Sequence, residues 1–373
     1  MAKRAYIGID GTARKIKKGY LGIDNVARKI KKAYIGIGGV ARPCWSGGEL
    51  AYYGAITPLS AARHSLAATS VGGYAIFGGG YNGSGGSAVV DAYDGSLTRT
   101  LAAELSTGRY NHAATSVGGY ALFGGGNKSS NEFLATVDAY NESLTRTLAA
   151  ELSTGRSMLV ATSVGGYALF AGGPNARGLS DVVDAYDESL TRTLPTALSE
   201  KLRYHAATSV GGYALFGGGY SNNGYLATVE AYDESLTHTL PAELSVGRQK
   251  LAATSVGNHA LFAGGEYYSS GAYTYFNTVD AYDESLTRTL PTELSAARAE
   301  LVATSVGGYA LFGGGNLLTT STVVDAYDES LTRTLPPKLS VGRRQLAATS
   351  AGGYALFGGG NSLTAVVDAY VVA

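Results

Sequence analysis

The chain has 373 residues, of which 45% are hydrophobic and 10% aromatic, so its composition predicts a globular protein with a sizeable core and excludes a disordered chain. Its 53 glycines and 27 tyrosines, against two methionines and one tryptophan, indicate tight turns between tyrosine-rich strands and therefore an all-β fold. The net charge of zero divides into +9 over residues 1–48 and −9 over the remainder, and the single cysteine, Cys44, excludes an intrachain disulfide framework.

The N-terminal region contains a repeat with a spacing of fourteen residues: AYIGIDGTARKIKK, GYLGIDNVARKIKK and AYIGIGGVARPCWS begin at Ala5, Gly19 and Ala33. Each copy has a YIGI-type strand, a pair of turn residues and a second short strand. The turn pairs suit type I′ turns, in which both central residues need a positive φ: Asp10-Gly11, Asp24-Asn25 and Gly38-Gly39. We predict three basic β-hairpins in residues 1–43 and a linker over residues 44–49.

A larger repeat begins near Leu59 and predicts the architecture of the rest of the chain. Seven units follow one another at spacings of 45 to 50 residues, with anchors at Leu66, His112, Leu159, His205, Leu251, Leu301 and Leu346. A typical unit reads as four short strands, LAATSV, YALFGGG, VVDAYD and LTRTL. Four antiparallel strands repeated seven times favour a closed seven-bladed β-propeller over residues 50–373, because closure leaves only short edges.

The two ends of this region predict how the ring closes. The last unit ends at VVDAYVVA and has no LTRTL strand, whereas LAYYGAITPLSAAR, residues 50–63, precedes the first unit in the place of such a strand. We therefore expect the N-terminal strand, near Tyr52 to Ile56, to pair with the last unit and latch the ring.

Two features of each unit resemble Kelch repeats: a double glycine that ends the second strand, as at Gly79-Gly80, and a tyrosine in the third strand, as at Tyr93. The resemblance covers about residues 50 to 373 and implies the Kelch-like propeller. The tryptophan that Kelch units usually carry in the fourth strand is absent, with residues such as Thr289 and Leu290 in that region, so we expect lightly packed outer strands. The GH and WD signatures of WD repeats are missing.

The basic hairpins and the following ARPCWSGGELAYYG resemble short repeats in tail or minor structural proteins of phages and prophages of Gram-positive bacteria. The resemblance implies attachment to a particle. The sequence has neither the apolar segment of a secretory signal nor a run of about eighteen apolar residues, so we expect no membrane insertion. The expected location is a virion or extracellular particle if the chain is phage-derived, and the cytoplasm otherwise.

The residues give no pattern for catalysis. A galactose-oxidase-like copper site needs a cysteine within the ring, but Cys44 precedes it, and the Asp-box of sialidase propellers does not occur. The five histidines fall in five different units without metal-ligand spacing, and GGYALFGGG lacks the Lys-Ser/Thr of a phosphate loop. We expect no enzyme activity, no metal and no cofactor.

An arginine stands before the first strand of six units, and an aspartate stands in the third strand of the same six. The arginines are Arg63, Arg109, Arg156, Arg248, Arg298 and Arg343, and the aspartates are Asp91, Asp138, Asp184, Asp280, Asp325 and Asp368. The arginines could form an anion site at the channel mouth, or each could pair with the aspartate of its unit. The fourth unit, which has Leu202 and Glu230 at these positions, favours the structural pair.

Two loops of each unit vary while the rest repeats, and the antiparallel strand order places both on one face. The opposite face is equally exposed, yet its SVGGY and DESLT turns hardly change, and DESLT contains no glycine that would fix it. Tyrosine, asparagine and arginine are typical of binding loops. The expected ligand-binding residues are His64, Tyr81, Tyr110, Asn111, Arg203, Tyr204, Tyr220, Tyr225, Gln249, Lys250, Tyr267, Tyr268, Tyr273, Tyr275, Glu300 and Arg344.

Together these patterns predict a non-catalytic binding module, a receptor-binding or adhesive component of a phage-like particle that recognises a glycan or protein. The basic hairpins would attach it to the particle or to further copies of the chain. Nucleic acid is disfavoured as a partner because no aromatic residues alternate within the basic strands. The alternatives are a propeller glycan hydrolase, which needs a cluster of carboxylates on the variable face, and an intracellular Kelch-type scaffold. Glu132, Asp181, Glu266 and Glu300 are evident there, in different units.

Overall fold

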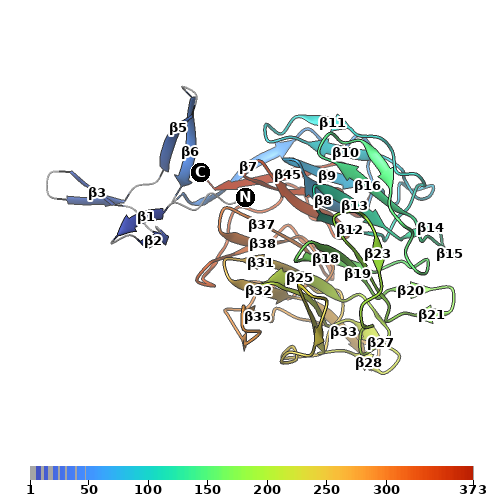
Figure 1. Ribbon diagram of the computed structural model, residues 1–373. Coiled ribbons are helices and arrows are strands. Elements are labelled where there is room, and N and C mark those ends of the chain that lie inside the picture. Colours follow the sequence, from blue (N-terminus) through green and yellow to red (C-terminus); the bar gives the residue numbers. More distant parts are fainter. Residues whose placement is uncertain are drawn as a thin grey trace.

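The computed structural model describes residues 48–372 and, before them, the backbone of six short strands within residues 6–46 (Figure 1). These six strands form three antiparallel hairpins in the region of the fourteen-residue repeat. They are β1 (Tyr6–Ile9) with β2 (Thr12–Lys15), β3 (Tyr20–Ile23) with β4 (Val26–Lys29), and β5 (Lys32–Ile37) with β6 (Val40–Ser46). Strand β6 extends into the segment expected as a linker, and the predicted turn pairs lie outside the described residues.

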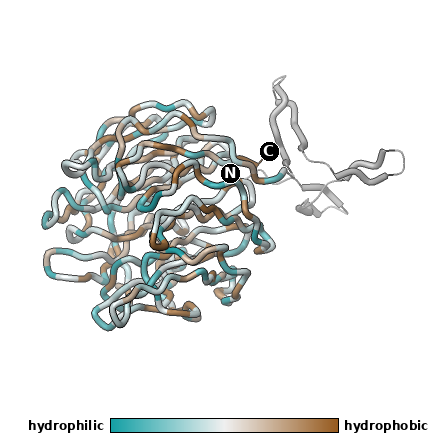
Figure 2. The backbone as a smooth tube through the Cα atoms, turned by 180° about the vertical axis from the view of Figure 1, so that it is seen from behind, coloured by the Kyte–Doolittle hydropathy of each residue, from teal (hydrophilic) through white to brown (hydrophobic). Residues whose placement is uncertain are grey.

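The all-β prediction is confirmed, since the described residues form strands and turns but no helix. No helix long and apolar enough to cross a membrane occurs in this part of the chain. Hydrophobic and hydrophilic stretches alternate along the backbone (Figure 2).

Seven four-stranded antiparallel sheets make up residues 50–372 of the described chain, and we number them 1 to 7 by their inner strands. The inner strands are β8 (Ala67–Val71), β12 (Ala113–Val117), β18 (Val160–Val164), β25 (Ala206–Val210), β31 (Ala252–Val256), β37 (Val302–Val306) and β43 (Ala347–Ala351). The second strands are β9 (Tyr74–Gly78), β13 (Tyr120–Gly124), β19 (Tyr167–Ala171), β26 (Tyr213–Gly217), β32 (His259–Ala263), β38 (Tyr309–Gly313) and β44 (Tyr354–Gly358).

The third strands are β10 (Val90–Tyr93), β16 (Val137–Asn141), β22 (Val183–Tyr186), β29 (Val229–Asp233), β35 (Val279–Asp283), β41 (Val324–Asp328) and β45 (Val367–Val372). The outer strands of sheets 1 to 6 are β11 (Arg99–Leu101), β17 (Arg146–Leu148), β23 (Arg192–Thr193), β30 (His238–Thr239), β36 (Arg288–Thr289) and β42 (Arg333–Thr334). As expected without the Kelch tryptophan, these outer strands are lightly packed, and Leu290 remains 59% exposed.

Sheet 7 takes its outer strand from the other end of the chain. Strand β7 (Leu50–Ile56) pairs antiparallel with β45, so the expected pairing of this segment with the last unit is confirmed. The Tyr52 hydroxyl donates a hydrogen bond of 2.6 Å to Asp368 Oδ1, and burial together with this carboxylate raises the pKa of Tyr52 to about 12. The inner strands contact one another in chain order, and β43 of sheet 7 also packs against β8 of sheet 1.

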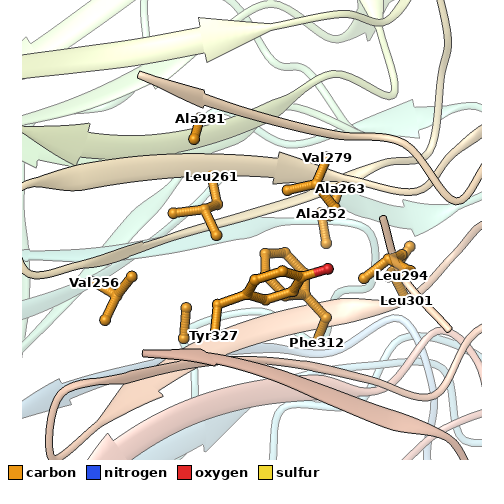
Figure 3. Packing of buried hydrophobic residues seen from close by; sticks show 11 residues of the cluster. Ala252, Val256, Leu261, Ala263, Val279, Ala281, Leu294, Leu301, Phe312 and Tyr327 are labelled. Carbon is orange, nitrogen blue, oxygen red and sulfur yellow. The ribbon is translucent and has the colours of Figure 1, made fainter. Parts of the chain in front are cut away.

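The hydrophobic core lies between neighbouring sheets. Phe312 and Tyr327 of sheet 6 pack against Leu261 and Val279 of sheet 5 (Figure 3), and equivalent clusters join the other sheets. In five of the seven sheets the phenylalanine of the second strand lies against a glycine of the preceding sheet: a Cβ added to Gly78 would come within 2.8 Å of the Phe123 ring. The residues that recur in every unit are therefore those that join one sheet to the next.

The constant turns on the face opposite the variable loops have a structural cause. In the SVGGY turn both glycines have positive φ, 55° and 86° at Gly72 and Gly73. In the DESLT turn at Asp187 the carboxylate accepts hydrogen bonds from the backbone N–H groups of Ser189 and Thr191, and Leu190 packs against the core. The expectation that DESLT lacks a structural reason to stay constant is therefore wrong.

We predict that deleting residues 50–58 exposes the edge of β45 and causes aggregation, because its unpaired backbone groups become available to other chains. A variant lacking only residues 1–49 retains β7 and serves as the control. Size-exclusion chromatography with light scattering and thermal melts would compare the two. A soluble monomer with unchanged melting temperature after deletion of residues 50–58 would contradict the latch.

Candidate functional site

Six buried ion pairs join the start of the inner strands to the third strands. In each, an arginine Nη2 lies 2.6 to 2.8 Å from an aspartate Oδ2, and both side chains are 0% exposed. The pairs are Arg63–Asp91, Arg109–Asp138, Arg156–Asp184, Arg248–Asp280, Arg298–Asp325 and Arg343–Asp368. The arginines are thus occupied and inaccessible, so the alternative of an anion site at the channel mouth is wrong.

Each buried carboxylate also binds the connection that leads from the preceding sheet. The Asp184 carboxylate, for example, accepts hydrogen bonds from the backbone N–H of Ser153 at 2.8 Å and from Arg192 of the outer strand at 3.0 Å. The carbonyl of each residue at the arginine position accepts a hydrogen bond from a glycine of the preceding sheet, including the bond from Gly360 in sheet 7 to Arg63 in sheet 1. The arginine therefore fixes the start of each inner strand.

Sheet 4 replaces this whole arrangement. Besides Leu202 and Glu230, it has His238 where the outer strands of sheets 1, 2, 3, 5 and 6 have arginine. The Glu230 carboxylate binds His238 Nε2 and the Ser199 hydroxyl and N–H, while Leu202 packs in the core between sheets 3 and 4. Three positions of sheet 4 thus differ together from the other units. The alignment of the units identified Leu202 and Glu230 but not His238.

The variable loops of each sheet pair with one another on one face, as expected. The residue after the arginine forms a backbone bridge with the second loop at His64 and Tyr81, at Tyr110 and Asn127, at Gln249 and Glu266, and at Ala299 and Asn316. The short hairpins of the second loops lie on the side of the molecule away from the C-terminus (Figure 1). They are β14 (Asn127–Ser129) with β15 (Glu132–Phe133), β20 (Pro174–Asn175) with β21 (Gly178–Leu179), and β27 (Tyr220–Ser221) with β28 (Gly224–Tyr225).

A cavity of about 340 Å³ opens at the centre of this face. Its lining residues come from all seven sheets: His64, Ser65, Tyr81, Tyr110, Asn111, Met158, Tyr204, Lys250, Glu300 and Gln345. Seven of the expected binding residues therefore gather in one place, whereas Ser65, Met158 and Gln345 were not selected from the sequence. The alignment of the units could have identified these three residues, because they occupy the same position as Asn111 and Tyr204, two residues after the arginine position.

In each unit the residue two positions after the arginine position lines the cavity. We call these seven residues the mouth ring, and they share an unusual backbone conformation. All seven have φ between 50° and 59°, in the left-handed region: Ser65, Asn111, Met158, Tyr204, Lys250, Glu300 and Gln345. Five backbone hydrogen bonds of 2.8 to 3.0 Å link ring members of neighbouring sheets. They connect Gln345 through Ser65 and Asn111 to Met158, and Tyr204 through Lys250 to Glu300.

The charged groups of the mouth neutralise one another. Lys250 Nζ lies 2.9 Å from Glu266 and 3.0 Å from Glu300, and Arg344 lies 3.1 Å from the other oxygen of Glu300. Burial alone would lower the pKa of Lys250, but the hydrogen bond to Glu266 and the charge of Glu300 outweigh it and raise this pKa above its usual value. Burial and the charge of Arg344 lower the pKa of His64, so its imidazole is neutral at pH 7.

Aromatic side chains form a continuous cluster beside the mouth on sheets 4 and 5. The hairpin of β33 (Glu266–Ser269) and β34 (Ala272–Tyr275) meets β28, where the Tyr225 hydroxyl accepts a hydrogen bond of 2.9 Å from the Tyr268 N–H. Ring centroids lie 4.8 to 6.2 Å apart in the pairs Tyr220–Tyr225, Tyr225–Tyr267, Tyr268–Tyr273 and Tyr273–Tyr275. Tyr268 and Tyr273 are 47% and 55% exposed.

Two other expected binding residues have different environments. The Arg203 guanidinium stacks over Tyr204, 5.0 Å from its centroid, and over Tyr220. Gln249 is buried and hydrogen-bonds Glu266, so it supports the mouth and presents no surface to a ligand.

A ring of aliphatic and imidazole side chains lies beneath the mouth, at the anchors of the seven units. A second cavity of about 260 Å³ is lined there by five leucines together with His112 and His205. Burial lowers the pKa of both histidines to about 3, and for His112 the charge of Arg109 adds to this effect. Over residues 48–372, no group of three or more histidine, cysteine, aspartate or glutamate side chains is placed to hold a metal ion.

The fold is similar to the solved structure of YjhT, a Kelch-type β-propeller, with a TM-score of 0.61. The two sequences are 15% identical, and the match covers 75% of this chain and 99% of the YjhT chain. No protein-family model and no curated protein matches the sequence. The likeness establishes a propeller-like all-β fold, while the resemblance to phage proteins stays a prediction.

Sheet 4 suggests a test of the buried pairs. We predict that Arg156→Leu lowers the free energy of unfolding by about 3 kcal/mol, because Asp184 loses its buried partner. The triple variant Arg156→Leu, Asp184→Glu, Arg192→His copies the residues of sheet 4 and should recover most of this loss. Urea unfolding of both variants checks the prediction, and a triple variant as unstable as the single one would contradict it.

The buried histidines predict a pH dependence. Below about pH 6.5 the unfolded chain takes up protons at His112 and His205, whereas the folded chain does so only near pH 3. The free energy of unfolding therefore decreases as the pH is lowered below about 6.5. At pH 5 each histidine should cost about 2 kcal/mol relative to pH 7.5. Replacing both by leucine, the residue of the other units, should remove this part of the slope in urea unfolding. Equal slopes in wild type and variant would show that these imidazoles are protonated in the folded state.

Proposed function

We propose that residues 50–373 form a closed seven-bladed Kelch-like propeller that acts as a non-catalytic binding module. Closure is supported by the order of the inner strands, by the contact between β43 and β8, and by the pairing of β7 with β45. In this proposal the seven sheets are the blades, and the ligand binds the face with the variable loops.

The observation that carries the proposal is the contrast between constant and variable residues. The constant arginines, aspartates, phenylalanines and tyrosines are all buried in contacts within and between sheets. The variable residues instead surround one cavity and one partly exposed tyrosine cluster. A cavity of this size with convergent polar groups and adjacent aromatic rings is the usual form of a ligand site.

The tyrosines of sheets 4 and 5 are suited to dominate the affinity. Their rings can stack on the apolar face of a sugar or enter a pocket on a protein, while their hydroxyls form hydrogen bonds. Tyr267 is half-buried against Tyr225 and Phe276, so it is held in place before a ligand arrives.

A glycan hydrolase is the competing function, since Glu266 and Glu300 meet at one point of the variable face. Both carboxylates bind Lys250, and Glu300 also binds Arg344. A glycosidase needs one carboxyl group that holds a proton and donates it to the leaving oxygen. Two ion-paired carboxylates do not fit this role, and turnover of any glycan by the purified protein would overturn our choice.

The N-terminal hairpins are proposed to attach the propeller to a phage-like particle. Their charge of +9 and their resemblance to phage tail repeats support this assignment, whereas an intracellular scaffold would bind a peptide through the same loops. A binding assay on host cells would separate the two functions. The receptor-binding module should bind the cell surface through its variable face, and the intracellular scaffold should not.

Glycan and protein arrays probed with the full chain should identify a ligand, and we predict that Tyr267→Ala and Tyr273→Ala each weaken its binding by about 2 kcal/mol or more. Tyr53→Ala is the matched control, since Tyr53 is 57% exposed and packs edge-on against Tyr354, away from the variable loops. Isothermal titration calorimetry measures the change. Weakened binding in the Tyr53 variant alone would place the ligand elsewhere.

A further inference from the structure

The mouth ring combines a fixed backbone with seven different side chains. In every sheet the residue has φ of 50° to 59°, a conformation in which any residue but glycine is sterically disfavoured. The chain contains 53 glycines, yet none stands in the ring. Because the backbone conformation is the same in all seven sheets, it does not account for seven different side chains at these positions.

Two other sets of positions with positive φ in this protein each keep one residue type. The double-glycine turns use glycine, and the DESLT turns use one leucine whose side chain packs against the core, as at Leu190 and Leu236. In the mouth ring the side chains differ in every sheet, and all seven line the same cavity. The side chain at this position is therefore retained for what it presents to the cavity.

We infer that the mouth ring selects the ligand and that the ligand is the neutral saccharide end of a glycan. This inference rests on the proposed binding function and names its ligand class. Lys250, Glu266, Glu300 and Arg344 hold two positive and two negative charges that pair with one another. No side chain lining the cavity offers an unpaired charge, since His64 is neutral at pH 7.

The remaining lining residues match the two surfaces of a sugar ring. Tyr81 lies with its centroid 5.5 Å from that of Tyr110 and 5.4 Å from that of His64, which gives an aromatic wall for the apolar C–H face. Three members of the mouth ring, Ser65, Asn111 and Gln345, provide hydroxyl and amide groups that can donate hydrogen bonds to sugar hydroxyls and accept hydrogen bonds from them. Met158 adds an apolar side chain to the lining.

Glycine substitution tests the ring because it removes the side chain and keeps the backbone hydrogen bonds. Met158→Gly and Asn111→Gly, made in the full chain, should leave the melting temperature unchanged within about 2 °C, since relief of the left-handed strain offsets the added freedom of the unfolded chain. The same variants should weaken saccharide binding at least tenfold. The probes are methyl β-D-galactopyranoside, methyl α-D-mannopyranoside, N-acetyl-D-glucosamine and lactose, with D-glucuronate as the charged comparison, all followed by saturation-transfer NMR.

Leu331→Gly is the matched control. Leu331 also has a positive φ, 61°, but lies in the DESLT turn after β41, on the face opposite the variable loops, and packs against the core. Its replacement should leave saccharide binding unchanged, and any fall in the melting temperature would report the lost core contact.

The outcomes separate this inference from the proposed function. Loss of saccharide binding in the ring variants, with stability retained, supports the ring. Saccharide binding that survives in them, or binding of D-glucuronate alone, overturns it. If no neutral saccharide binds but a protein ligand does, and Tyr267→Ala weakens it, the ring inference fails and the proposed function stands. Binding that neither set of variants affects overturns both.

Discussion

The buried arginine–aspartate pair is the interaction on which the remaining geometry depends. The arginine side chain binds the third strand of its own sheet, while its carbonyl accepts a hydrogen bond from the preceding sheet, so one residue fixes the position of two sheets. A buried pair of this kind contributes little net stability, because desolvation offsets the attraction, but it tolerates only one arrangement of its partners. The two residues that follow the arginine are consequently delivered to the same place in the six sheets that have the pair, and in sheet 4 the Leu202 carbonyl keeps the same hydrogen bond from the preceding sheet.

Within each unit, the residues that hold the sheets together and the residues proposed to bind the ligand therefore occupy different positions of the sequence. From the arginine onward, the third residue lies in the mouth ring and the fourth is the anchor beneath it, as at Arg63, Ser65 and Leu66. The constant DESLT and SVGGY turns are explained by capping hydrogen bonds and glycine backbone geometry, so their constancy says nothing about function on the other face. The argument for binding instead rests on the mouth ring, where the backbone is constrained and the side chain is free to differ.

Much of the fold could be predicted from the sequence because the repeat displays it seven times. The strands, the pairing of β7 with β45 and the ion pairs follow from aligned residues and from the missing LTRTL strand. The left-handed ring could not be predicted, since none of its seven residues is glycine and no turn signal marks it. The burial of Gln249 was also missed, because a variable position reads as exposed until its contacts are known. His238 was overlooked, since its role appears only beside Glu230.

A nearly sevenfold scaffold presents a problem for recognition, because most ligands lack that symmetry. The constant residues cannot supply the asymmetry without losing the contacts that join the sheets. The mouth ring and the second loops are free of that restriction, and they place an aromatic wall on sheets 1 and 2, a balanced ion-pair network on sheets 5 to 7 and a tyrosine cluster on sheets 4 and 5. An uneven ligand surface can therefore be matched residue by residue, with the backbone beneath it unchanged.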